Sequence, residues 1–210
     1  MNLNSAKINL PIDVHLESLV SLLQKHQNLV ISAAPGSGKT TRLPPALLNH
    51  FHKKILVLEP RRIAALAAAD RISQENNWQL GEQVGYQVRF DNCYNQQTRL
   101  LFLTEALLTR KMIDDPSLDD IDVIVLDEFH ERSLHVDLAI GLIKELQQLS
   151  RPDLKMVIMS ATLDVAKLKN TLPDTVCYEV PGQLYPLDLI YQKKEMKLQR
   201  LLSLTRKAID

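Results

Sequence analysis

The chain has 210 residues, of which 45% are hydrophobic and 24% are charged, as is usual for a globular domain with a sizeable core. Its 25 Lys and Arg residues balance 25 Asp and Glu residues, which excludes a nucleic-acid coat built on overall positive charge. No apolar run is long enough to span a bilayer, and the N-terminus lacks the features of a signal peptide, so we expect a cytoplasmic protein with no membrane partner. Cys93 and Cys177 have no metal-like spacing and are expected to be reduced thiols.

Helix-like and strand-like segments alternate along the chain. In chain order the pattern predicts a helix over 13–25, a strand over 28–33, a helix over 41–49, a strand over 54–58, a helix over 61–75, an extended segment over 84–90, a strand over 100–103, a helix over 105–112, a strand over 123–126, a helix over 136–149, a strand over 156–159, a short helix over 165–172, and extended segments over 176–180 and 187–191. This alternation predicts an α/β fold, a mostly parallel sheet with helices on both faces. The carboxyl ends of parallel strands meet at one edge, so the loops after Ile31, Leu58, Leu103, Leu126 and Met159 should share that edge.

The segment 33–40 has the composition of a phosphate-binding loop between a strand and a helix. Gly36 and Gly38 have no Cβ, so the backbone can turn tightly and approach a ligand closely. Successive amides then face an anion at a helix N-terminus, Lys39 adds a positive charge, and the Thr40 hydroxyl can ligate Mg²⁺. The alternative is a flexible turn that happens to contain Gly-Lys-Thr, and the flanking strand and helix argue against it.

Two acids, Asp127 and Glu128, follow the apolar run 123–126. In a phosphate-binding ATPase, the first acid of such a pair holds Mg²⁺, and the second orients and deprotonates the attacking water. A solvated acidic turn is the alternative. Together with the segment 33–40, the pair predicts an ATP-hydrolysing site.

Further segments resemble the motifs of superfamily 2 helicases of the DEAH type, in the order found in that family. Asp127-Glu128-Phe129-His130 resembles the Asp-Glu-x-His box, Ser160-Ala161-Thr162 the third motif, Glu59-Pro60-Arg61-Arg62 motif Ia, Thr104-Glu105 motif Ib, and Val84-Gly85-Tyr86 an Ic-like segment. Phe129 and Leu43-Pro44 look most like the bacterial HrpB-type ATP-dependent helicases. The resemblance covers about residues 28–191 and implies a RecA-like P-loop NTPase domain, ATP and Mg²⁺ as cofactors, and single-stranded RNA or DNA as partner, with RNA favoured.

The resemblance also implies roles for individual residues. The phosphates and Mg²⁺ would be held by Gly36, Ser37, Gly38, Lys39, Thr40 and Thr41, and the magnesium site would comprise Thr40, Asp127 and Glu128. Glu128 would act on the catalytic water, His130 would couple nucleotide state to a partner motor domain, and Ser160 and Thr162 would link hydrolysis to domain movement. The nucleic-acid track would include Arg61, Arg62, Thr104 and Glu105, and Arg71 matches an arginine that stacks on adenine.

Simpler interpretations exist for several of these residues. His130 can be a structural hydrogen-bonding histidine, and Arg71 a solvated helix arginine. Arg61 and Arg62 can be surface charges, although the helix dipole disfavours cations at a helix N-terminus, which favours an anionic partner there. The chain departs from the family pattern at Ala33, at Ala106 and at Gln183-Leu184.

We expect residues 1–192 to form a first RecA-like domain and residues 193–210 to be a helical tail that starts a second one. No arginine-finger motif follows Ser160-Ala161-Thr162, so the isolated chain should bind nucleotide weakly and hydrolyse it very slowly. Two other functions remain open from the sequence: a nucleotide-binding regulatory module without motor activity, and an unrelated P-loop ATPase.

Overall fold

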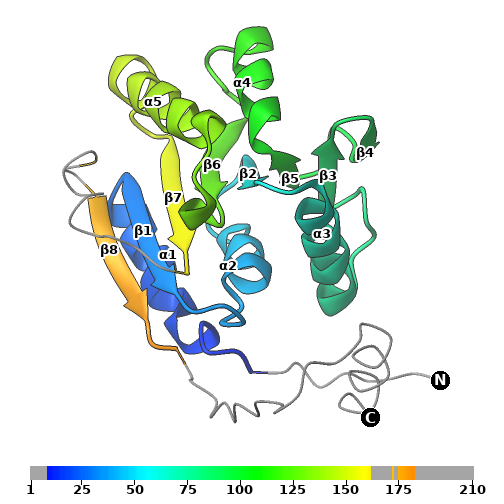
Figure 1. Cartoon of the computed structure of the whole chain (residues 1–210), viewed down its shortest axis with the longest axis vertical. Coiled ribbons are helices and arrows are strands. Elements are labelled where there is room, and N and C mark those ends of the chain that lie inside the picture. Colours follow the sequence, from blue (N-terminus) through cyan, green and yellow to red (C-terminus); the bar gives the residue numbers. More distant parts are fainter. Residues whose placement is uncertain (1–8, 162–171, 173–174, 183–210) are drawn as a thin grey trace, which may run out of the picture.

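The computed structural model describes residues 9–161, 172 and 175–182, and within them it contains one eight-stranded sheet (Figure 1). The strand order is β4-β3-β5-β2-β6-β7-β1-β8. The strands are β1 (Asn28–Ala33), β2 (Lys54–Glu59), β3 (Val84–Val88), β4 (Asp91–Cys93), β5 (Leu100–Thr104), β6 (Ile121–Leu126), β7 (Lys155–Ser160) and β8 (Thr175–Val180). Every neighbouring pair is parallel except the β3–β4 hairpin, so the predicted mostly parallel α/β fold is confirmed.

Helices cover both faces of the sheet. They are α1 (Leu16–Lys25), α2 (Lys39–Leu47), α3 (Arg62–Asn76), α4 (Glu105–Asp114) and α5 (Leu134–Leu149), with short 3₁₀ helices η1 (Asp13–His15) and η2 (Phe129–Glu131). One buried cluster joins α1, α2 and α3 to one face of the sheet, and a second joins α4 and α5 to the other. Alternate residues of the central strands enter the two clusters, as Val57 and Leu58 of β2 do, because successive side chains of a strand point to opposite faces.

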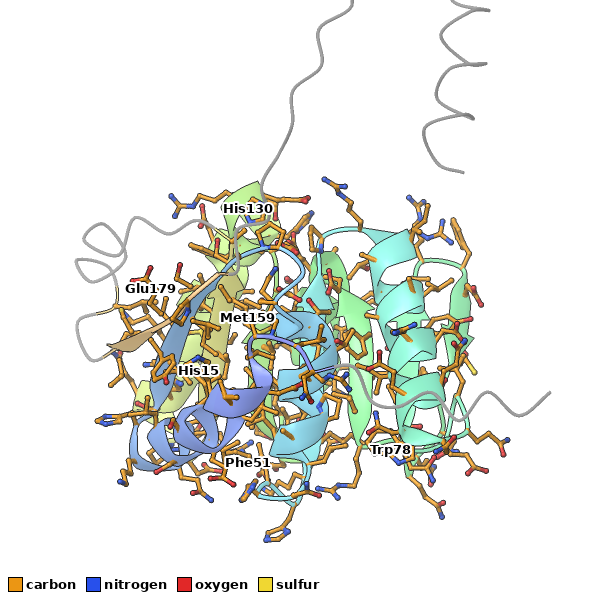
Figure 2. The ribbon with its side chains drawn as sticks, turned by 90° about the horizontal axis from the view of Figure 1, so that it is seen from below. His15, Phe51, Trp78, His130, Met159 and Glu179 are labelled. Carbon is orange, nitrogen blue, oxygen red and sulfur yellow. The ribbon has the colours of Figure 1, made fainter. Side chains whose placement is uncertain are left out.

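The parallel strands carry their following loops to a single edge of the sheet, as predicted. His130 lies at this edge, while Phe51 and Trp78 lie toward the opposite edge (Figure 2). Trp78 packs against the cluster of α1, α2 and α3. The loops that follow β1, β2, β5, β6 and β7 therefore form a common surface.

Some details differ from the sequence prediction. The first helical segment is divided, because η1 precedes α1, and α2 begins at Lys39 rather than at residue 41. Strand β4 was not expected, since Asp91–Cys93 lacks an apolar pattern and is specified only by its pairing with β3. The predicted segments 165–172 (except Leu172), 187–191 and 193–210 lie outside the described residues.

Cys93 and Cys177 are both free thiols, as predicted. Among the described helices, none is both long and apolar enough to cross a membrane.

Candidate functional site

The loop between β1 and α2 has the backbone that the glycines predict. Gly36 has φ +76° and Gly38 has φ +91°, both in the left-handed region that L side chains rarely adopt. A Cβ on Gly38 would lie 2.6 Å from Cδ1 of Leu10, whereas a Cβ on Gly36 would meet no atom within 4 Å. The loop is therefore packed against the chain at Gly38 and open at Gly36, where a ligand can approach the backbone. Ala33 ends β1 with ordinary strand geometry, as expected.

Unpaired donors gather at this loop. Gly38 is the N-cap of α2, and the first amides of a helix have no acceptor within the helix. The side chain of Ser37 is buried, and its Oγ has no hydrogen-bond partner. Buried polar atoms are usually hydrogen-bonded, so this hydroxyl and the helix N-terminus fit an anionic ligand such as a phosphate.

The acids after β6 face this loop. Nζ of Lys39 lies 3.1 Å from Oε1 of Glu128, and Oγ1 of Thr40 donates a hydrogen bond to Oδ2 of Asp127. The backbone amide of Glu128 donates to Oδ1 of Asp127 over 2.7 Å. Strand β7 lies between β1 and β6, so the sheet topology brings the two segments to neighbouring positions at one edge. The two segments thus face each other, with their side chains in direct contact.

Glu128 occupies an unusual backbone conformation. Its φ of 49° and ψ of 40° are left-handed, and it precedes the 3₁₀ turn η2. Such conformations are uncommon for residues other than glycine and cluster at functional sites. In this conformation the carboxylate lies between two nitrogens. Its Oε1 contacts Nζ of Lys39, and its Oε2 lies 3.3 Å from Nδ1 of His130. His130 thus contacts the acid that the sequence assigned to the catalytic water.

The site contains a third acid, Glu59, for which the motif resemblance implies no individual role. Glu59 is the last residue of β2 and is only 2% exposed, and the pairing of Leu58 with Leu126 brings it beside Asp127. Burial, followed by the negative charge of Asp127, raises the pKa of Glu59 to about 9. Burial also raises the pKa of Asp127, against the hydrogen bond from Thr40 and the charge of Lys39. An acid at the end of a continuous apolar strand was the sequence feature that could have revealed Glu59.

The donor set fits Mg²⁺ bound together with a nucleotide. The Thr40 hydroxyl and the carboxylates of Asp127 and Glu128 are hard oxygen ligands. In the described part of the chain, no three His, Cys, Asp or Glu residues form a cluster that could hold a metal ion alone. Mg²⁺ usually takes one or two carboxylates and completes its shell with water and substrate phosphates, which agrees with this arrangement.

A pocket of about 300 Å³ opens beside these groups. Its lining includes Thr40, Glu59, Arg61, Glu128, His130 and Glu131. Arg61 forms a two-pronged ion pair with Glu131, with Nη2–Oε1 2.7 Å and Nε–Oε2 3.1 Å. This pair joins the segment after β2 to the segment after β6 in the lining of the pocket.

Three other predicted residues, Arg62, Thr104 and Ser160, do not line this pocket. Arg62 is exposed at the start of α3, and Thr104 ends β5 beside Glu59 of β2. Ser160 is fully buried at the end of β7, opposite Ser32 of β1, and Thr162 lies outside the described residues.

Two predicted residues are held by partners within the chain. Glu105 is buried and accepts a hydrogen bond from the Ser133 hydroxyl, which itself accepts from the amide of Val136 at the start of α5. Arg71 is exposed on α3 and donates to Glu75 over 2.6 Å. The contact of Glu105 with nucleic acid and the contact of Arg71 with adenine remain predictions.

Comparison with known proteins gives consistent matches. The DEAD/DEAH box helicase family model matches residues 13–171. The ATP-dependent RNA helicase HrpB of Escherichia coli (strain K12) is 42% identical over 185 residues, which are 87% of this chain and 23% of that protein. A crystal structure of the E. coli DEAH/RHA helicase HrpB superposes with a TM-score of 0.81 at 42% identity, covering 85% of this chain and 23% of the other. A structure of the E. coli DExH-box NTPase HrpB gives a TM-score of 0.82 at 38% identity, covering 98% and 26%. The chain therefore spans about a quarter of the length of these relatives.

Proposed function

The chain belongs to the DEAD/DEAH box helicase family, as its motifs predict, and on that premise we propose that it binds ATP with Mg²⁺, hydrolyses it, and acts on a single nucleic-acid strand. The observation that carries this proposal is the contact between the β1–α2 loop and the two acids after β6. Lys39 reaches Glu128, and Thr40 reaches Asp127, within one continuous site.

Each group has a physical role in the proposed reaction. The amides at the start of α2 and the Lys39 ammonium bind the phosphates, and Thr40 and Asp127 hold the metal. When bound, Mg²⁺ neutralises charge on the phosphate oxygens. Glu128 orients the attacking water and accepts its proton. Phosphates that attract Lys39 would weaken its ion pair with Glu128 and free the carboxylate for this task.

His130 gives the catalytic acid a second contact. Its Nδ1 lies 3.3 Å from Oε2 of Glu128, and its side chain lines the pocket at the open edge of the sheet. A change in the position of Glu128 on nucleotide binding is therefore transmitted to a residue that a neighbouring domain can touch. We propose His130 as the link between nucleotide state and domain movement.

The nucleic-acid partner is supported by the cations at the same edge. Arg61 and Arg62 lie where α3 begins, next to the pocket, and both are exposed. Backbone phosphates are recognised by such cations without regard to base sequence. One relative is named an ATP-dependent RNA helicase, which favours RNA as the strand.

A second RecA-like domain is proposed to complete the site. The relatives are about four times as long as this chain, which covers 23% of HrpB. Arginine fingers supplied from outside a motor domain accelerate phosphoryl transfer by about 10³–10⁵ in other systems. The isolated chain should therefore bind nucleotide but turn it over slowly.

Equilibrium binding of a fluorescent ATP analogue tests this function. Binding should strengthen at least tenfold when Mg²⁺ replaces EDTA, because the carboxylates otherwise face the phosphates with uncompensated charge. Single-stranded RNA and DNA of the same sequence would then be compared as stimulators of hydrolysis. Failure to bind the analogue with or without Mg²⁺ would contradict the proposal.

A further inference from the structure

A short turn ahead of α1 packs against the phosphate loop between β1 and α2. Leu10 and Asp13 close this turn on each other, since the Asp13 amide donates to the Leu10 carbonyl over 2.9 Å and the Leu10 amide donates to Oδ2 of Asp13 over 2.8 Å. Residues 10–13 are called the N-terminal turn below. Neither the motif assignments nor the proposed reaction gives this turn a role.

Two contacts join the N-terminal turn to the phosphate loop. The Ile12 amide donates to the Ser37 carbonyl over 3.1 Å, and Ile12 is itself fully buried in the cluster of α1, α2 and α3. Leu10 packs so closely on Gly38 that a Cβ there would lie 2.6 Å from Cδ1 of the leucine. The turn therefore contacts both of the residues that directly precede Lys39.

The hydrogen bond from Ile12 fixes the direction of the next amide in the loop. A trans peptide unit is planar, so its N–H points away from its C=O. Holding the Ser37 carbonyl toward Ile12 therefore turns the Gly38 amide away from the N-terminal turn. This amide stands at the N-cap of α2, among the donors that are proposed to bind phosphate.

Asp13 anchors the N-terminal turn to α2 through Arg42. Oδ1 of Asp13 lies 3.5 Å from Nε of Arg42, whose side chain is 5% exposed, and Nη1 of Arg42 lies 3.0 Å from Oε2 of Glu75 on α3. The Arg42 amide donates to the Gly38 carbonyl over 2.8 Å. Ion pairs that are shielded from water are stronger than exposed ones, so this network holds the turn against the start of α2.

The glycines of the phosphate loop explain why such support matters. Gly36 and Gly38 have positive φ, and a glycine that is not held by its surroundings populates many backbone conformations. Ordering a flexible backbone on binding lowers affinity, and a fold that orders it beforehand avoids this loss. Contacts that hold Ser37 and Gly38 therefore prepare the loop for its ligand.

We propose that Asp13 is a positioning residue of the phosphate site: it holds the N-terminal turn, through which Leu10 and Ile12 keep the peptide between residues 37 and 38 ready for a polyphosphate ligand. This inference rests on the proposed function. Asp13 acts through the loop and not on the phosphates. Because its negative charge alone would repel phosphate, loss of the acid should weaken binding only through the loss of positioning.

The test compares Asp13→Ala and Leu10→Ala, which remove the anchor and the packing, with Leu10→Met, which keeps most of the volume. Glu17→Ala, at an exposed acid on α1, is the control for loss of charge. The measurement is competition of inorganic tripolyphosphate with a fluorescent ATP analogue in Mg²⁺, at a temperature where thermal unfolding shows each variant to be folded. Tripolyphosphate has no base, so it reports on the phosphate site alone.

Asp13→Ala and Leu10→Ala should each raise the dissociation constant for tripolyphosphate by about fivefold or more, because the ligand must then order the loop. Leu10→Met and Glu17→Ala should stay within about twofold of the unsubstituted chain. If Asp13→Ala does not fold, Asp13→Asn takes its place and should also weaken binding. The asparagine keeps an acceptor for the Leu10 amide but no charge for Arg42.

Three results would overturn the inference. They are unchanged or tighter tripolyphosphate binding by the folded variant at Asp13, unchanged binding by folded Leu10→Ala, and an equal loss of affinity in Leu10→Met. If the unsubstituted chain binds neither tripolyphosphate nor the ATP analogue, the proposed function fails and the inference fails with it, a result distinct from the other three.

Discussion

Nζ of Lys39 and Oε1 of Glu128 lie 3.1 Å apart, although Lys39 begins the helix after β1 and Glu128 lies in the loop after β6. The lysine side chain is 6% exposed and the glutamate side chain 30% exposed, so the ion pair is partly shielded from water. A charge pair in this environment interacts more strongly than one on the surface. The pair therefore links the start of α2 to the acid that we propose as catalytic, with no ligand present.

Glu128→Gln should separate binding from hydrolysis. The amide retains an oxygen near Lys39, so affinity for the ATP analogue should change by no more than about threefold, whereas loss of a general base costs about 10²–10⁴ in rate. Binding is measured at equilibrium and hydrolysis in a single turnover with strand present. Glu145→Gln, at an exposed position of α5, is the control. Hydrolysis at the unsubstituted rate would remove Glu128 from the catalytic role.

Arg62→Ala should weaken binding to a single strand of RNA. Each phosphate contact that is lost should lower the slope of log affinity against log salt by about 0.7. Fluorescence anisotropy of a labelled oligonucleotide over a salt series measures both quantities. The control is Arg110→Ala, since Arg110 is exposed on α4. Identical slopes for Arg62→Ala and the control would place the strand elsewhere.

The stability of the metal-free chain should fall as pH rises. The pKa of Glu59 is raised from 4.5 to about 9, so the folded chain holds a proton that the unfolded chain releases within this interval. The contribution is fully present below pH 4.5 and is lost as pH rises towards 9. Urea unfolding at pH 6 and pH 9 in EDTA measures the change, and Glu59→Gln should reduce it. A larger free energy of unfolding at pH 9 would reverse the predicted sign.

Arg151→Met should destabilise the fold without touching the site. The Arg151 guanidinium, which is buried, donates to the carbonyls of Ser117, Leu118 and Ile121 at 2.9, 2.5 and 2.7 Å. Each carbonyl left without a donor costs about 1–3 kcal/mol, so we expect the three together to cost at least about 3 kcal/mol. Urea unfolding measures the loss, with Arg110→Met as control. A change below about 1 kcal/mol would show that solvent replaces the guanidinium.

The sequence predicted the central sheet well, because its strands are continuous apolar runs. Such runs are typical of a sheet that is covered on both faces. The runs 54–58, 123–126 and 156–159 all became central strands. The sequence was a poorer guide to the secondary-structure elements whose local pattern is weak. Strand β4 depends on pairing with β3, and α2 begins at Lys39 because left-handed Gly38 caps it.

The candidate site was predicted in part, for a similar reason. Lys39, Thr40, Asp127 and Glu128 stand in compact segments whose order already indicates the chemistry. Glu59 was missed although it ends a continuous apolar strand, because its place beside Asp127 arises from the register of β2 against β6. The two-pronged contact between Arg61 and Glu131 depends in the same way on two loops meeting at one edge.

Binding of the fluorescent ATP analogue to Lys39→Ala, with Mg²⁺ and with EDTA, tests the central claim most directly. The substitution removes the positive charge that faces the phosphates and leaves Glu128, Asp127 and Glu59 without their nearest cation. Affinity in Mg²⁺ should fall at least tenfold, or by about 1.4 kcal/mol, while Lys53→Ala at an exposed position should leave it unchanged. Equal affinities of Lys39→Ala and the unsubstituted chain, with both folded, would contradict the assignment of this loop to nucleotide phosphate.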